Sequence, residues 1–402
     1  MQTNLTPAAL STDPGREAEA ILRSCVHCGF CNATCPTYQL LGDELDGPRG
    51  RIYLIKQMLE GRAVTRKTQG HLDRCLTCRA CETTCPSGVR YARLADIGRE
   101  LIEAEVTRPW AERALRSALR AVIPHRRRFT PLLRLGQWLR PLLPGAPGRA
   151  VPPRRRAAPW PAARHARHML ALDGCVQPAI APNIDAAAAR VLDRLGISLI
   201  RARGGGCCGA LSQHLAAPAE ARDFARRNID AWWPHIEQGV EAIVVTASGC
   251  GTQVKDYGRL LATDAGYASK AHRVAELARD LSEVLADSDL APLRAAAPAR
   301  VAFHSPCSLQ HGLRLGGVVE DILTRAGFTL TPVADAHLCC GSAGTYSLLQ
   351  GRLARELRRL KLAALSAGAP AVIATANIGC LTHLAAGSEL PVQHWIELLD
   401  AG

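Results

Sequence analysis

Two runs of four cysteines near the N-terminus have the spacing of iron–sulfur ligands. Each run reads C-x2-C-x2-C-x3-C-P, and the second follows the first by 50 residues. Such a loop turns three thiolates toward one four-iron cube, and in two-cluster ferredoxins the fourth cysteine of each run ligates the other cluster. The pattern therefore predicts two [4Fe–4S] clusters, one held by Cys25, Cys28, Cys31 and Cys85 and the other by Cys75, Cys78, Cys81 and Cys35.

Structural zinc is the alternative interpretation of these cysteines. Pairs such as Cys25/Cys28 and Cys75/Cys78 also build zinc ribbons with four thiolate ligands. Zinc would leave four of the eight cysteines unexplained, whereas two cubes use all eight. Iron–sulfur chemistry is therefore favoured. His27 lies inside the first loop and is expected beside the cluster without ligating it, because cysteines already fill the ligand positions.

The composition indicates a soluble protein of several domains in a reducing compartment. A chain of 402 residues has room for two to four domains at roughly 150 residues each. Sixteen clustered cysteines, without a secretory apolar segment after Met1, favour metal ligation over disulfides and a cytoplasmic location. No apolar run reaches about 18 residues, so no membrane span is expected.

The elements that must position the first two sites are predicted to be helices. Asp13-Pro14 is expected to begin a helix that leads into the first loop, and another helix is expected near 92–105. Between the runs, an apolar stripe predicts a helix packed on the clusters: Ile52, Ile55, Met58 and Leu59. Three cations beside this stripe either neutralise the negative clusters or form a solvated face: Arg49, Arg51 and Lys56.

The positive charge of the chain is concentrated in one segment. The net charge is +13, and residues 106–168 alone contribute +14, with 15 Arg, no Lys and one acid, Glu112. The rest of the chain is therefore close to neutral. Leucines recur at helical spacing beside Trp138: Leu132, Leu135, Leu139 and Leu142. Pro131 and Pro141 are expected to confine this helix to about three turns.

Two interpretations of residues 106–168 remain open. The leucine-rich helix suits a peripheral membrane surface or the groove of a partner. Alternatively, the segment is an arginine-rich linker partly packed on its own domains. No nucleic-acid-binding fold accompanies the charge, so nucleic acid is not expected as a partner.

From residue 169 the chain repeats itself. In each copy, a cysteine is followed after 31 residues by a Cys-Cys-Gly triplet and later by one more cysteine. Three of the four pairs are 132 residues apart, and the last pair is 130 apart. The first set is Cys175, Cys207, Cys208 and Cys250, and the second is Cys307, Cys339, Cys340 and Cys380. This self-similarity predicts two copies of one structural unit.

Both copies have the pattern of a parallel α/β unit. Each contains a helix, a glycine turn and a strand, and short β-branched runs at 242–247 and 371–376 end just before a Gly-Cys pair. We therefore expect two similar units with parallel strands, facing each other across a pseudo-twofold axis, with cysteines at the strand ends. Gly209 and Gly341 allow the turn that adjacent cysteines need to reach one site.

Two ferredoxin runs joined to two Cys-Cys-Gly repeats resemble the iron–sulfur subunit family of bacterial glycolate oxidase (glycolate dehydrogenase). The resemblance covers essentially the whole chain and is tightest over 25–31, 36–53 and 75–91. It implies an α+β ferredoxin-type (alpha-helical ferredoxin-like) two-cluster domain followed by two α/β cysteine-rich CCG domains. The boundaries expected are 1–105 for the two-cluster domain, 106–168 for the linker, and 169–296 and 297–402 for the CCG domains.

The resemblance also implies a role in electron transfer. In the family, a separate FAD-containing subunit oxidises glycolate to glyoxylate, and the iron–sulfur subunit relays electrons to a quinone or other membrane acceptor. This places the chain peripherally on the cytoplasmic side of the inner membrane. No residue is expected to act on glycolate, because the sequence lacks a flavin or nicotinamide motif. The small subunit of anaerobic glycerol-3-phosphate dehydrogenase has a similar layout, and a thiol–disulfide reductase is the other alternative.

The cysteines of the two CCG repeats resemble those of heterodisulfide reductase, with one departure. There, each repeat can supply a fifth cysteine three places before the last, but this chain has Ala247 and Asn377 at those positions. Four thiolates per repeat suit an ordinary further cluster, and all eight suit one shared site. A purely structural role is the remaining possibility, because buried cysteine is a common small core residue.

Overall fold

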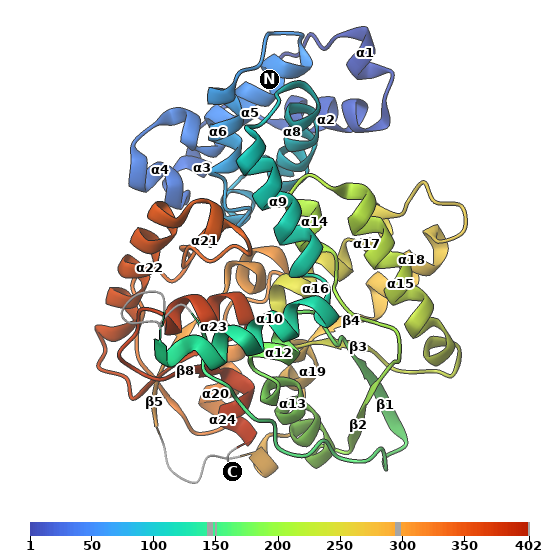
Figure 1. The fold of residues 1–402 in the computed structure, drawn as a ribbon, viewed down its shortest axis with the longest axis vertical. Helices are drawn as coiled ribbons and strands as arrows, with labels where there is room; N and C mark the ends of the chain where they lie inside the picture. The colour runs from blue at the N-terminus through green and yellow to red at the C-terminus, as the bar shows by residue number, and fades with distance from the viewer. Residues whose placement is uncertain (143–147, 149–150, 294–298, 401–402) are drawn as a thin grey trace.

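The computed structural model describes residues 1–142, 148, 151–293 and 299–400. A helical N-terminal domain lies at one end of two α/β units (Figure 1). A helical arm extends from this domain and runs between the two units. The domain boundary expected at 296/297 lies outside the described residues. Within them, no helix is both long and apolar enough to cross a membrane.

The N-terminal domain is the alpha-helical version of the predicted ferredoxin-like fold, since residues 1–142 contain no strand. Its elements are α1 (Pro7–Leu10), α2 (Asp13–Ser24), α3 (Phe30–Ala33), α4 (Pro36–Leu41), η1 (Glu44–Asp46), α5 (Pro48–Leu59), α6 (Arg66–Asp73), α7 (Ala80–Thr83) and α8 (Tyr91–Glu105). The hydroxyl of Thr12 accepts a hydrogen bond from the Gly15 N–H, so Thr12 caps α2, one residue before the expected Asp13.

The first cysteine loop follows α2, the second follows α6 and leads to α8, and α5 packs between them. The predicted stripe on α5 is buried in one core with the side chains of Cys25 and Cys75. Gly98 on α8 allows α5 to approach closely, because a Cβ atom there would lie 2.7 Å from Cγ1 of Ile55. The loops therefore start from a rigid helical base.

The arginine-rich segment is partly an extension of this domain. Arg108 is buried and pairs with Asp73 at 2.6 Å and with Glu103 and Glu112. The chain then forms α9 (Trp110–Val122), α10 (Arg126–Leu139) and the turn η2 (Arg140–Leu142).

The prediction that the leucine-rich helix begins at Pro131 was wrong. Helix α10 begins at Arg126 and runs through Pro131. Pro131 is exposed, so the carbonyl four residues earlier, which it cannot bond, faces water. The inner face of α10, with Phe129 and Leu133, packs on the core of the α/β units.

The two α/β units have the predicted parallel sheets, each with four strands. The first has the order β2-β1-β3-β4 and the second β6-β5-β7-β8. The strands are β1 (Arg167–Ala171), β2 (Ile197–Arg201), β3 (Ile243–Val245), β4 (Ala278–Asp280), β5 (Arg300–His304), β6 (Thr329–Leu330), β7 (Val372–Thr375) and β8 (Val392–His394). The repeat in the sequence is thus a repeat in topology.

Helices cover both sheets. Those of the first unit are α12 (Gln177–Ile180), α13 (Asn183–Arg194), α14 (Ala210–His214), α15 (Pro218–Glu237), α16 (Ser248–Lys255), α17 (Tyr257–Leu260), α18 (Ala268–Leu277), α19 (Leu281–Ala286) and η3 (Ala291–Leu293). Those of the second are η4 (Ser308–Gly312), α20 (Val318–Arg325), α21 (Tyr346–Leu349), α22 (Gly351–Ser366), α23 (Ile378–Ala385) and α24 (Trp395–Asp400).

The units meet beside the carboxyl ends of their strands. The Ser248 N–H donates to the Ala376 carbonyl at 3.2 Å, and the hydroxyls of Ser248 and Ser308 are 2.7 Å apart. The Nε2 atom of His394 lies 2.9 Å from the carbonyl oxygen of Thr246. These contacts bring the two sets of cysteine loops face to face.

We predict that Gly341→Ala strongly destabilises the second unit. Gly341 has a φ of 89°, and a Cβ atom would lie 2.7 Å from the Ala354 carbonyl oxygen. We expect a loss of about 2–4 kcal/mol in the free energy of unfolding, measured by urea titration of anaerobic protein with circular dichroism. Gly327→Ala is the control, since Gly327 has a φ of 97° but nothing within 4 Å, and should lose only about 1 kcal/mol. Equal losses would contradict the steric argument.

Candidate metal centres

The two ferredoxin loops have the same backbone conformation. In the first loop, His27 and Gly29 have φ of 58° and 87°; in the second, Thr77 and Arg79 have φ of 54° and 62°. Left-handed residues curl a C-x2-C-x2-C loop so tightly that its three side chains face one point. The loops end in the short helices α3 and α7, which contain the third cysteines.

Each loop collects its fourth thiol from the other run. Burial, followed by the nearby thiols of Cys25, Cys28 and Cys85, raises the pKa of Cys31 to about 11, which identifies its neighbours. In the second group, burial raises the pKa of Cys81, as do Cys78, Cys75 and Cys35. The structure thus brings together the same two sets of four that the spacing predicts. Their role as cluster ligands remains a prediction.

Cations lie close to the second group. Burial would raise the pKa of Cys75, but the guanidinium groups of Arg51 and Arg99 hold it below its ordinary value. Arg51 is 1% exposed, with Nη1 4.0 Å from the Cys35 sulfur, so it is the predicted neutralising cation. Arg49 and Lys56 instead pair with Glu44 and Glu60, at 2.6 and 2.8 Å.

The spacing of these thiols fits clusters better than single ions. Ligands on one tetrahedral zinc ion lie about 4 Å apart, because zinc–sulfur bonds are about 2.3 Å long. Among the described residues, two groups of three possible ligands have all their ligand atoms within 4.8 Å, and neither includes an N-terminal cysteine. One group is Asp43, Asp46 and His71, in which Asp46 already accepts from Arg74 at 2.7 Å. His27 also belongs to neither group.

The cysteines of each CCG repeat lie together at the carboxyl ends of its strands. In the first repeat, the hydrogen bond with Cys207 raises the pKa of Cys175, and the bonds with Cys207 and Cys250 raise the pKa of Cys208. In the second, the sulfur atoms of Cys307 and Cys339 are 3.8 Å apart.

Cys340 bridges the remaining pair of the second repeat. The hydrogen bond with Cys339 lowers the pKa of Cys340, but the hydrogen bond with Cys380 and burial raise it by more. The pKa of Cys340 therefore lies well above its ordinary value. Both predicted sets of four thiols therefore form in space.

The second repeat touches the second ferredoxin group. Cys78 and Cys307 pack against one small apolar core around Leu76 and Cys339. Burial raises the pKa of Cys78, and Cys307 is its next strongest influence. The ammonium group of Lys361 is also close, since Cys339 and Cys340 act to raise its pKa although burial lowers it overall. Thiols from the N-terminal domain and from the second repeat thus lie in contact with one another.

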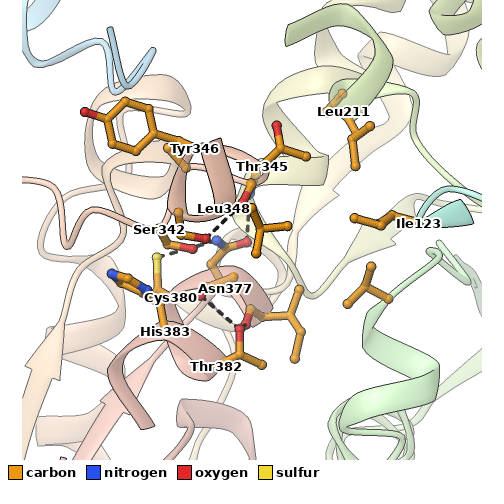
Figure 2. Close-up of a pocket in the computed structure, with 18 of the residues that line it drawn as sticks. Ile123, Leu211, Ser342, Thr345, Tyr346, Leu348, Asn377, Cys380, Thr382 and His383 are labelled. Carbon is orange, nitrogen blue, oxygen red and sulfur yellow. Dashed lines mark hydrogen bonds between the residues drawn. The ribbon is translucent and has the colours of Figure 1, made fainter. Parts of the chain in front are cut away.

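A cavity of about 1550 Å³ lies between the two repeats. One wall is apolar and includes Ile123 and Leu211, and the opposite wall carries Ser342, Thr382 and His383 from the second repeat (Figure 2). The cavity is lined by cysteines of both repeats and by Cys75: Cys175, Cys207, Cys208, Cys250, Cys307, Cys339 and Cys380.

The two positions that lack a fifth cysteine differ in their contacts. Asn377 directs Nδ2 to the sulfur of Cys380 at 3.5 Å (Figure 2), and its Oδ1 accepts from the Gly249 N–H at 3.4 Å. Ala247 offers only a methyl group. In the second repeat an amide therefore takes the place of the fifth thiol.

One candidate ligand, His304, was not predicted from the sequence. A ring nitrogen of His304 and the sulfur atoms of Cys340 and Cys380 lie within 4.8 Å of one another, and all three residues are buried. Burial lowers the pKa of His304 to about 3, so its imidazole is neutral. Comparing the repeats position by position would have revealed it, because Leu172 precedes Cys175 as His304 precedes Cys307.

Comparison with known families agrees with this architecture. A family model described as a 4Fe-4S dicluster domain matches residues 21–89, and one described as a cysteine-rich domain matches 169–255 and 301–385. The fold and its sites thus define an iron–sulfur protein with a two-cluster domain and two cysteine-rich domains.

Full-length relatives identify the family. The chain is 58% identical over 401 residues to the glycolate oxidase iron-sulfur subunit of Escherichia coli K12, covering all of this chain and 98% of that protein. It is 28% identical to the probable glycolate oxidase iron-sulfur subunit of Bacillus subtilis 168, covering 93% of this chain and 90% of the relative. The chain belongs to the family of glycolate oxidase iron–sulfur subunits, which are components of an oxidoreductase. The predicted family and fold are thereby confirmed.

More distant similarities concern parts of the chain or its fold. Lactate utilization protein A of Anoxybacillus flavithermus is 25% identical, covering 54% of this chain and 92% of the relative. The crystal structure of a hypothetical protein from Helicobacter pylori superposes with a TM-score of 0.55 at 10% identity, over 96% of this chain and 72% of that one, which indicates a shared fold.

We predict that Cys85→Ala removes the first centre, although Cys85 belongs to the second run. The variant should lose about four irons, and the EPR spectrum of the dithionite-reduced, anaerobic protein should match that of Cys28→Ala. Cys35→Ala should match Cys78→Ala in the same way. Thr34→Ser, beside Cys35, is the control and should keep the full iron content. If the Cys85→Ala spectrum instead matched that of Cys78→Ala, the fourth cysteine of each run would not ligate the cluster of the other run.

Proposed function

We propose that this chain is the electron-transfer subunit of a glycolate-oxidising complex. In this proposal, an FAD-containing partner oxidises glycolate to glyoxylate, and two [4Fe–4S] clusters on this chain carry the electrons onward. The first would be held by Cys25, Cys28, Cys31 and Cys85, and the second by Cys75, Cys78, Cys81 and Cys35. The observation that carries the proposal is the contact between the second N-terminal group and the second repeat, where Cys78 lies beside Cys307 and Cys339.

A further iron–sulfur centre in the second CCG repeat extends this relay. Its four thiols lie next to the second N-terminal group, and Lys361 supplies a nearby positive charge to offset thiolates. The first repeat has four thiols and Arg227 beside Cys207, which suits another centre. When bound, these groups accept and donate single electrons, while the chain holds them in a buried path and excludes water.

The first cluster loop is the proposed entry point for electrons. Cys28 is exposed, and apolar side chains surround it: Val26 is 68% exposed, Phe30 62% and Tyr53 44%. Exposed apolar groups of this kind mark protein–protein contacts. The flavoprotein partner fits this patch, because its electrons must enter at an accessible centre.

The outer face of α9 and α10 is the proposed contact with the membrane that holds the acceptor. Its exposed side chains combine apolar and cationic groups, as in helices that lie on anionic lipid. The apolar ones are Trp110, Leu115, Leu132, Leu135, Trp138 and Leu142, and the cationic ones are Arg126, Arg127 and Arg128. A quinone is the proposed acceptor. Glycerol-3-phosphate dehydrogenase chemistry is disfavoured, because the relatives that match over the full length are glycolate oxidase subunits.

We predict that Phe30→Glu slows reduction of the clusters by the flavoprotein subunit. A charge at the centre of the apolar patch should weaken docking, so cluster reduction after glycolate addition should be roughly tenfold slower. Stopped-flow absorbance of the reconstituted complex measures this rate. Leu360→Glu is the control, since Leu360 is 46% exposed on α22, outside the patch.

Two outcomes would overturn parts of this assignment. An unchanged rate in Phe30→Glu, with full iron content, would place the flavoprotein elsewhere. Glycolate oxidation by the isolated chain with a dye acceptor would remove the division of labour altogether. Turnover of a disulfide by the isolated chain, abolished in Cys339→Ser, would favour the thiol–disulfide reductase.

We also predict that Leu135→Glu combined with Trp138→Glu releases the protein from vesicles. Removing two exposed apolar side chains should lower binding to vesicles containing phosphatidylglycerol roughly tenfold or more. Co-sedimentation measures bound protein, and Leu360→Glu should bind like the unmodified chain. Unchanged binding would show that this face of α9 and α10 is not the membrane contact.

A further inference from the structure

The two cysteine-rich repeats differ at one buried position. His304 is the last residue of β5 and lies three places before Cys307. The corresponding residue of the first repeat is Leu172, three places before Cys175. Both are buried, at 2% and 6% exposure. The second repeat therefore places an imidazole where the first places a hydrocarbon.

The His304 ring is not satisfied by the protein. Its Nε2 atom is buried and has no hydrogen-bond partner among the residues that the structure describes, which is unfavourable because burial without a partner loses the hydrogen bond to water. Two other histidines of this unit, the half-buried His383 and the buried His394, are bonded: Nε2 of His383 lies 3.1 Å from the Ala354 carbonyl oxygen, and Nε2 of His394 lies 2.9 Å from that of Thr246. A buried imidazole without a protein partner suits a metal ligand.

The surroundings of His304 supply the other ligands. A ring nitrogen of His304 and the sulfurs of Cys340 and Cys380 lie within 4.8 Å of one another. Cys340 interacts with Cys339, whose sulfur is 3.8 Å from that of Cys307. His304, Cys340 and Cys380 thus converge on one point, and the neighbouring Cys339 and Cys307 connect it to the second N-terminal group.

We propose that His304 is a ligand of an iron–sulfur centre in the second cysteine-rich repeat, together with Cys340 and Cys380. The first repeat offers thiolates alone, so the two repeats are chemically distinct. Imidazole ligands raise the reduction potential of an iron–sulfur centre relative to all-thiolate ligation. The second repeat is therefore the site where an electron from the Cys75, Cys78, Cys81 and Cys35 cluster collects. This proposal rests on the proposed electron-transfer function.

The test is pulsed EPR of the whole chain, prepared anaerobically with ¹⁵N-labelled histidine and reduced with dithionite. We expect a ¹⁵N coupling to a paramagnetic centre. The coupling should disappear in His304→Cys, which keeps a ligand at that position, and in His304→Leu, which copies the first repeat. The centre that remains in His304→Cys should have a lower midpoint potential. His383→Gln is the control and should keep the coupling, because His383 lines the same cavity but bonds to the backbone.

Each result has one meaning. Cube signals without a histidine coupling, or a coupling that persists in both His304 variants, would overturn the role of His304 and leave the proposed function standing. A histidine coupling that depends on His304, in a protein without the two N-terminal cubes, would support His304 and overturn the proposed relay.

Discussion

The packing of thiols against thiols is the constraint on which the rest of this structure depends. Thiolates repel one another, and burial together with neighbouring thiols raises the pKa of Cys81 and Cys78 well above the ordinary value. Such a group is stable as neutral thiols or as ligands of a positively charged metal. Arg51, Arg99 and Lys361 lie beside the sulfurs, and their positive charges favour the thiolate, which is the form that binds metals. These cations occupy buried positions that a purely apolar core would give to hydrocarbon side chains.

The duplicated α/β units bring together cysteines that are far apart in the sequence. Parallel strands bring all their carboxyl ends to one edge of a sheet, so loops distant in sequence meet there. Cys307, Cys339 and Cys380 follow β5, β6 and β7 in this way. Two such edges face each other through contacts such as Ser248–Ser308, and the helical domain covers the gap. The two edges and the helical domain together line a cavity of about 1550 Å³, beside which redox groups can lie close together.

Features whose residue spacing is set by local chemistry could be predicted from the sequence. Features that depend on how distant segments pack together could not. The cysteine sets, the parallel sheets and the turn glycine Gly341 followed from local rules. The burial of Arg51 and the absence of a partner on His304 Nε2 did not, because they depend on segments brought together only by folding. Helix α10 begins before Pro131 for the same reason, since Phe129 is held on the α/β core.

Exposure along the chain of thiols gives the proposed relay a direction. The first N-terminal group reaches the surface at Cys28, whereas Cys339, Cys340 and Cys380 are at most 4% exposed. An electron donor can therefore reach the first group directly and the second repeat only through the protein or the cavity. Water and mobile charge stabilise the more negative, reduced state of an exposed centre, so burial alone would lower the potential of the inner one. A neutral imidazole ligand adds no negative charge to that inner site, whereas a further thiolate would, so His304 opposes the effect of burial on the reduction potential.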